Sequence, residues 1–230
     1  FVTSHLAERL GVAHVVTGYD FHFGKGRKGS PATMVELGRK LGFGVSIVEQ
    51  VTDEGGPHAP FSSSAIREAL RQGHVAGAAR ALGYHWTVLG EVVKGDQRGR
   101  TIGFPTLNIV LDRGADPFRG IYAVRVRDAA RPGVAAWAGA GYFGDRPTFD
   151  TGRTFLEVYL IGFEGELYGR EMLVEFIDLI RPDRRFDSIA ALVSQMNADC
   201  AEALKRLAAV KAQDPVTGFL LGRLQAEGRI

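Results

Sequence analysis

The chain has 230 residues, of which 45% are hydrophobic and 23% are charged, and its net charge is +2. This length and balance exclude a disordered, fibrous or collagen-like chain and suit one large domain or two small ones. The modest charge is far from the strongly basic character of a nucleic-acid-binding protein, and no apolar run reaches membrane-spanning length, so we expect neither partner.

The first 83 residues alternate helical and β-rich patterns, which is typical of a parallel α/β unit. In chain order the expected elements are a helix, a strand, a helix, a strand and a helix, at residues 1–10, 14–17, 31–41, 43–49 and 64–73. Ser30 and Pro31 should begin the second helix, and Gly42 should end it. Because Phe1 already lies inside a helical pattern, we expect the natural start to lie upstream.

From about residue 84 the chain changes to short runs of valine, isoleucine and aromatic residues separated by turns, which predict an antiparallel sheet or barrel. The expected strands are residues 86–93, 120–126, 134–142, 155–161 and 172–177. Apolar residues at helical spacing from Ile189 to Leu207 then predict a helix that Asp187 caps. The sequence thus indicates a first domain over 1–83, a second over 84–210, and a polar or glycine-rich tail over 211–230.

A basic loop, GKGRKG at residues 24–29, matches the GxGxxG pattern of dinucleotide-binding folds, and Glu49 lies at a suitable distance. Five residues, 19–23, separate this loop from the preceding strand, where that fold requires an immediate turn. Ser30 also occupies the place where a phosphate-binding P-loop requires lysine. A solvated basic loop is the simpler interpretation.

Two segments of the first domain, GYDFHFGKGRKG at 18–29 and FSSSAIREAL at 61–70, resemble motifs of the bacterial riboflavin kinase/FMN adenylyltransferase family. In that family the serine-rich segment opens a helix and the following arginine meets nucleotide phosphates, which suits helix N-terminal amides and a guanidinium. The resemblance therefore implies nucleotide contacts in the adenylyltransferase part. The matching positions are Ser62, Ser63, Ser64 and Arg67. A serine cap with a solvated arginine remains the alternative.

The stretch GRTIGFPTLNI at 99–109 joins a glycine-rich segment to an apolar strand. Glycines at 95, 99 and 103 allow the backbone to approach a polyphosphate closely. Thr106 and Asn108 are two residues apart on an extended segment, so both project from one face, where their oxygens suit Mg²⁺. The alternative is that both side chains bond only to nearby backbone groups.

This stretch, with VVKG at 92–95, resembles the riboflavin kinase signature of a glycine-rich flap that runs into PTxN. The resemblance continues in family order over 84–207, through residues 120–123, 144–149, 156–160, 167–169 and 180–188. It implies a β-barrel with a C-terminal helix that phosphorylates riboflavin with ATP and Mg²⁺ to give FMN. The implied ATP-binding residues are Gly95, Gly99, Arg100, Gly103, Thr106 and Asn108, with Thr106 and Asn108 also holding the metal.

Glu157 alternates with apolar and aromatic residues in the run FLEVYL and falls where the family carries its catalytic base, which also contacts the flavin. Arg181 and Phe186 match the family segment that helps to enclose the flavin. The alternatives are that Glu157 faces solvent, that Arg181 forms a surface ion pair and that Phe186 is a core aromatic residue. The six histidines show no metal-ligand spacing, and Cys200 should be an apolar-face residue of the last helix.

The expected molecule is a riboflavin kinase barrel joined to the C-terminal remnant of a Rossmann-like nucleotidyltransferase domain. We do not expect this chain alone to convert FMN to FAD, because the HxGH motif that the family's adenylyltransferase uses is absent from the sequence. The single cysteine excludes an internal disulfide framework and fits the reducing cytoplasm. The alternatives are a non-catalytic flavin-nucleotide binding or regulatory module and an oligonucleotide-binding barrel, and self-association is left open.

Overall fold

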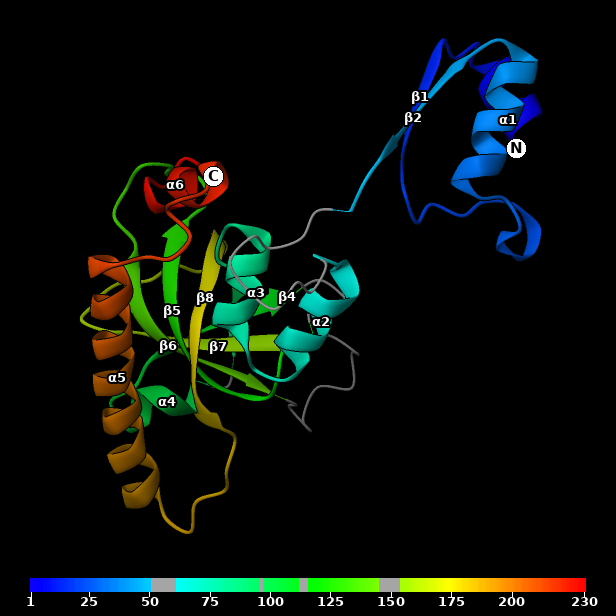
Figure 1. Cartoon of the computed structure of the whole chain (residues 1–230). Coiled ribbons are helices and arrows are strands. Elements are labelled where there is room, and N and C mark those ends of the chain that lie inside the picture. Colours follow the sequence, from blue (N-terminus) through cyan, green and yellow to red (C-terminus); the bar gives the residue numbers. More distant parts are fainter. Residues whose placement is uncertain (51–60, 96, 112–115, 145–153) are drawn as a thin grey trace. The chain divides into compact units, whose positions relative to one another are not determined.

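A computed structural model describes residues 1–50, 61–95, 97–111, 116–144 and 154–230 (Figure 1). The chain divides into two compact units, Phe1–Ser62 and Ser63–Ile230. The predicted motif segment at 145–149 lies outside the described residues. Within the described ranges, no helix combines the length and the apolar character needed to cross a membrane.

The first unit is a parallel βαβ arrangement. Its elements are the π-helix η1 Val2–Arg9, strand β1 His14–Gly18, the 3-10 helix η2 Lys25–Arg27, helix α1 Pro31–Leu41 and strand β2 Gly44–Val48. Strands β1 and β2 pair in parallel over their full lengths. Ser30 Oγ accepts a hydrogen bond from the Thr33 backbone N–H, and Gly42 ends α1 with a φ of +83°, as the sequence predicted. Val2, Met34 and Phe43 form a small buried core.

The second unit is built on a closed antiparallel barrel, with the strand order β3-β4-β7-β6-β5-β8. The strands are β3 Thr87–Val93, β4 Thr106–Leu111, β5 Gly120–Asp128, β6 Trp137–Gly144, β7 Thr154–Leu160 and β8 Glu171–Pro182. The predicted antiparallel barrel is therefore confirmed. Strand β8 continues five residues beyond its predicted end at 177 and pairs with both β3 and β5, which closes the barrel.

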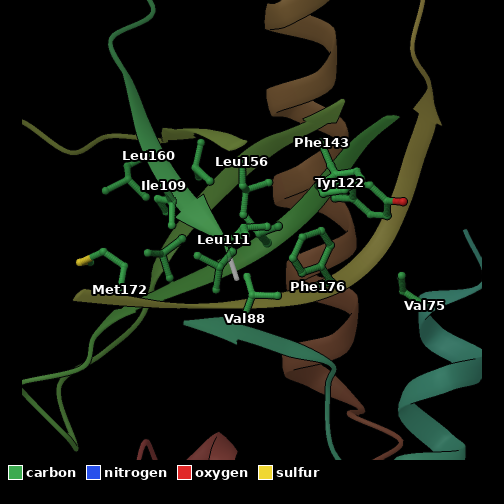
Figure 2. Close-up of a cluster of buried hydrophobic side chains, with 14 of the residues drawn as sticks. Val75, Val88, Ile109, Leu111, Tyr122, Phe143, Leu156, Leu160, Met172 and Phe176 are labelled. Atoms are coloured by element: carbon green, nitrogen blue, oxygen red, sulfur yellow. The ribbon is translucent and has the colours of Figure 1, made fainter. Parts of the chain in front are cut away.

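Alternate residues of the barrel strands face inward and form the main core (Figure 2). Ile109, Leu156 and Phe176 are fully buried there, and the rings of Phe176 and Tyr122 meet edge to face with centroids 5.0 Å apart. Because successive side chains of a strand point to opposite faces, the intervening residues of the same strands face the outside of the barrel. Those outward residues provide the surface on which a site can be built.

Helices pack around this barrel (Figure 1). They are α2 Ser63–Arg71, α3 Val75–Leu82, α4 Arg98–Thr101, α5 Ile189–Ala212 and α6 Leu220–Ala226. Leu70, Val75 and Ala78 of α2 and α3 belong to the main core, so this unit begins about twenty residues before the predicted boundary at 84. The cap prediction for α5 was wrong. Ser188, not Asp187, is the N-cap, because its Oγ accepts the Ala191 backbone N–H at 3.1 Å.

The segment after α5 folds back onto the barrel. Gln225 of α6 accepts the His85 backbone N–H at 2.7 Å and donates to the His85 carbonyl at 2.9 Å and to Thr87 Oγ1 at 2.8 Å. Val216 is fully buried. The last residues are thus packed against the start of β3, where the sequence had predicted a polar or glycine-rich tail.

Candidate active site

A cavity of about 340 Å³ lies against the outer face of the barrel, with α5 along one side and the segment at 99–104 at its edge. The described residues that line it come from these elements and from the connection between β8 and α5: Gly99, Ile102, Phe104, Thr106, Ile121, Ala140, Tyr142, Glu157, Tyr159, Arg181, Asp183, Arg184, Phe186, Leu192, Met196, Asp199 and Cys200. The cavity therefore brings together Gly99, Thr106, Glu157, Arg181 and Phe186, which the sequence had singled out. Most of its wall is apolar or aromatic.

Strand pairing sets the register of the polar residues that line the cavity or lie next to it. Asn108 of β4 lies directly opposite Glu157 of β7, and Thr106 lies opposite Tyr159. On its other side Glu157 lies opposite Tyr142 of β6. Because directly opposed residues share a face at Cβ separations of about 5 Å, the Asn108 and Glu157 side chains are neighbours. The prediction that the Thr106 and Asn108 side chains project from one face of the strand agrees with this register.

Within the glycine-rich segment, residues 98–101 form the short helix α4. A Cβ on Gly99 would lie 2.1 Å from the Phe104 carbonyl oxygen, and a Cβ on Gly95 would lie 2.3 Å from Asn108 Nδ2. Only glycine permits these approaches. The Gly95 backbone therefore lies against Asn108, which is 4% exposed and lines neither described cavity. Gly103 precedes β4 with a φ of +84°.

A second cavity of about 490 Å³ adjoins the first through Thr106, which lines both. Arg100 lines only this second cavity, where its Nη2 donates to Tyr168 Oη at 3.1 Å. The Lys94 ammonium lies 5.8 Å from the centre of the Tyr168 ring. The predicted ATP-binding residues are thus divided, with Gly99 at the first cavity and Arg100 at the second.

Two basic residues that line the first cavity pack against Phe186. The guanidinium carbons of Arg181 and Arg184 lie 5.6 Å and 4.7 Å from the centre of its ring. Arg181 also forms an ion pair with Asp199, which is 4% exposed. Arg184 lies in the family-like segment at 180–188 but was not singled out, and no sequence signal marked Asp199, because their contacts join segments that only the fold brings together.

Cys200, which was expected on the apolar face of α5, lines the cavity as well. Burial, together with the nearby Asp199 carboxylate, raises the pKa of the Cys200 thiol to about 11. The thiol is therefore protonated at neutral pH and contributes an apolar surface. Within the described ranges, no three His, Cys, Asp or Glu residues are grouped so as to hold a metal ion.

The residues predicted for the adenylyltransferase part lie elsewhere. Ser63 and Ser64 are the first residues of α2, Ser62 precedes them, and the Arg67 side chain is exposed on the same helix. None of them is among the described residues that line the two cavities. The basic loop at 24–29 belongs to the first unit, where Phe23 and Gly29 form an antiparallel bridge.

The alignments to known relatives cover both units of the chain. It is 38% identical over 202 residues to the bifunctional riboflavin kinase/FMN adenylyltransferase of Escherichia coli K12, covering 86% of this chain and 62% of that protein. The protein of the same name from Bacillus subtilis is 38% identical, with 85% of this chain and 61% of that protein covered. The crystal structure of a macrolide-efflux protein from Streptococcus pneumoniae has a TM-score of 0.70 at 34% identity, covering 86% of this chain and 62% of that one. The chain thus spans less than two thirds of the length of these relatives.

Two family models match the chain. The model for FAD synthetase matches residues 1–64, and the model for riboflavin kinase matches residues 82–207. The second match covers more than half of the chain and contains every described residue that lines the first cavity. The chain belongs to the riboflavin kinase family.

Proposed function

We propose that the chain is a riboflavin kinase that transfers the γ-phosphate of ATP to the terminal hydroxyl of the riboflavin ribityl chain, giving FMN and ADP. One observation carries this proposal. The Glu157 carboxylate lies in a largely apolar cavity, directly opposite Asn108 and next to Thr106, which is shared with a second cavity.

The first cavity suits a flavin. Its volume of about 340 Å³ falls at the lower end of the range for small-molecule sites. Phe104 and Tyr159 meet edge to face with ring centroids 4.9 Å apart, and Leu192 and Met196 of α5 complete an apolar wall. A flat ring system with one polar edge can be buried there while its polar chain points toward Glu157.

The second cavity suits the nucleotide. Arg100 and Lys94 lie near the Tyr168 ring, which offers a face for a base, and Arg100 is also paired with Glu166 at 3.4 Å. Because Thr106 lines both cavities, a nucleotide bound there would direct its terminal phosphate toward the first cavity at this residue. The Gly99 backbone, which carries no side chain, lines the first cavity together with Thr106.

The donor set suits a magnesium ion, with Thr106 at this junction and the buried Asn108 beside it on β4. The Thr106 hydroxyl and the Asn108 amide oxygen are hard ligands on adjacent outward positions of β4, and the Glu157 carboxylate lies opposite Asn108. Thr106 and Asn108 would hold the ion. When bound, Mg²⁺ neutralises phosphate charge during phosphoryl transfer.

Glu157 is positioned to act as the general base. As the riboflavin hydroxyl oxygen bonds to the γ-phosphorus, the bond from that phosphorus to the bridging oxygen breaks, ADP leaves, and the hydroxyl proton moves to the Glu157 carboxylate. The aromatic and apolar residues around the cavity exclude water, which would otherwise compete with riboflavin for the phosphoryl group.

The proposal is tested by incubating the purified chain with riboflavin, ATP and MgCl₂ and separating the flavins by chromatography, with ADP release measured in parallel. We expect FMN and ADP in equal amounts. Riboflavin binding without FMN would favour the alternative of a non-catalytic flavin-nucleotide module. Adenylyltransferase activity is not proposed for this chain, and the cytoplasmic location inferred from its single cysteine stays a prediction.

A further inference from the structure

Two polar residues of α5, Gln195 and Asp199, hold the basic wall of the first cavity in place. Resting on the proposed function, we propose that these two are positioning residues, which fix Arg181, Arg184 and Phe186 in the geometry that receives the flavin. They act through these neighbours and do not take part in the phosphoryl transfer.

The first contact is a bidentate ion pair between Arg181 and Asp199. Arg181 Nε donates to Asp199 Oδ1 at 2.9 Å, and Arg181 Nη2 donates to Asp199 Oδ2 at 2.7 Å. The remaining nitrogen, Nη1, donates to the Pro182 carbonyl at 3.0 Å. Parallel hydrogen bonds from a planar guanidinium to a carboxylate fix the orientation of both groups. The plane of Arg181 is therefore set beside Phe186.

The second contact extends this arrangement to Arg184. Gln195 lies one turn before Asp199 on α5, and its Nε2 donates to Asp199 Oδ1 at 2.7 Å. Its Oε1 accepts a hydrogen bond from Arg184 Nη2. Both basic residues on Phe186 are thus connected to the same carboxylate, one directly and one through Gln195.

Docking of α5 onto the barrel does not depend on this cluster alone. Farther along α5, Arg206 donates to Asp178 of β8 at 2.6 Å and to Glu202 at 2.7 Å. Neither Arg206 nor Asp178 is among the described residues that line the cavity. Among the described residues, two ion pairs therefore connect α5 with β8, and of these the pair at Asp199 borders the cavity.

Asp199 also determines which groups Arg181 can reach. Another carboxylate, Asp183, lines the same cavity two positions along the chain. Without Asp199, the Arg181 guanidinium would lose its bidentate partner and could turn toward Asp183. Such a turn would disrupt the wall that Phe186 and the two guanidinium groups form. The affinity for flavin should therefore fall more than kcat does.

The test compares Asp199→Asn and Gln195→Ala with the matched control Asp178→Asn, which removes the other ion pair between α5 and β8. For the two test variants we expect the riboflavin Kd, measured by flavin fluorescence, and the riboflavin KM to rise about tenfold, while kcat stays within about threefold and the KM for ATP is unchanged. The control should keep the wild-type riboflavin KM. Riboflavin Kd values equal to that of wild type would overturn the proposal.

A second measurement does not depend on catalysis. Trypsin can cut after Arg184 and Arg185, whereas Pro182 protects the bond after Arg181. In the ligand-free protein we expect faster cleavage at residues 184 and 185 in both test variants than in the control. Equal cleavage in all three would overturn the proposal even if the wild type made no FMN, a result that would contradict the proposed function separately. If Asp199→Asn fails to fold, Gln195→Ala decides both measurements.

Discussion

Glu157 lies between Asn108 and Tyr142 in the strand register, on the outer face of the barrel. We expect Glu157→Gln to lower kcat for FMN formation by about 10² to 10⁴, the range for removing a general base, with riboflavin affinity kept. Steady-state kinetics and riboflavin titration measure the two quantities. A kcat within a few-fold of wild type would show that another group accepts the proton.

Thr106 lines both cavities, and Asn108 lies buried two positions along the same face of β4. We expect Thr106→Val and Asn108→Ala to raise the KM for the magnesium nucleotide more than the Kd for riboflavin, because the lost oxygens face the metal and phosphates. The measurement is kinetics at varied ATP and Mg²⁺ beside riboflavin binding without nucleotide. Equal losses in both affinities would contradict a metal-binding role and indicate a folding defect.

At the level of residues, the sequence predicted where short motifs place their side chains, while the roles of these residues stay predictions. Thr106, Asn108 and Glu157 lie in extended segments, so alternation alone places each on a definite face. It could not identify Asp199, because an aspartate in a helix has no distinctive pattern and its partner Arg181 lies eighteen positions away on a strand. The close approach of Gly95 to Asn108 likewise follows from the fold and not from glycine content.

Among the elements, the C-terminal helix α6 depends on a close backbone contact at Gly222. A Cβ there would lie 2.0 Å from the Val216 carbonyl oxygen, whereas Gly218 has nothing within 4 Å of its Cβ position. We expect Gly222→Ala to lower the free energy of unfolding by about 1–3 kcal/mol, the usual effect of overpacking, while Gly218→Ala changes it little. Urea unfolding measures both, and equal stabilities would show that α6 adjusts freely.

The sequence predicted the strands of the barrel well, because each has alternating or β-branched runs bounded by turns. It did not predict α3, whose residues Val75–Leu82 are mostly small and give a weak helical pattern. It also missed α6, which is short and contains Gly222. Both are stabilised by tertiary contacts, through Val75 in the main core and through Gln225 at His85, and such contacts have no local signal.

For the second unit as a whole, a buried polar cluster connects the end of the chain to the barrel. His85 Nε2 lies 3.0 Å from Asp214 Oδ1, Arg125 contacts both Asp214 and Glu175, and Arg127 contacts Glu175. His85 Nδ1 is buried and has no hydrogen-bond partner among the described residues. Burial lowers the pKa of His85 below its ordinary value, an effect to which Arg125 adds and which Asp214 and Glu175 oppose.

This cluster predicts a pH dependence of stability. The pKa of His85 is lower in the folded state than in the unfolded state, so the unfolded state binds more protons below about pH 6.5. The free energy of unfolding should therefore fall as pH drops through about that value and be unaffected by His85 well above it. At pH 5.5 the loss from His85 is at most about 1.4 kcal/mol. Urea unfolding of wild type and His85→Gln at pH 7.5 and 5.5 measures the difference. The same pH dependence in both proteins would show that His85 does not cause the loss of stability at low pH.

A second prediction for the whole chain concerns FAD. The described residues of the unit that matches FAD synthetase contain two paired strands, and the sequence lacks HxGH. We expect the purified 230-residue chain to form no FAD from FMN, ATP and Mg²⁺, as measured by chromatography, with a full-length bifunctional relative as the positive control. FAD formation at a rate near that of riboflavin phosphorylation would refute this expectation.

The alternation of the barrel strands has a consequence for protein engineering. Ile109, Leu156 and Val158 fill the interior, and their immediate neighbours Asn108 and Glu157 belong to the outer face. Selection for heat tolerance and selection for catalytic rate therefore act on different side chains of the same strands. Substitutions restricted to inward-facing positions could repack the interior at constant volume and raise the melting temperature. The affinity for either proposed substrate would be kept, because the outward-facing side chains are unchanged.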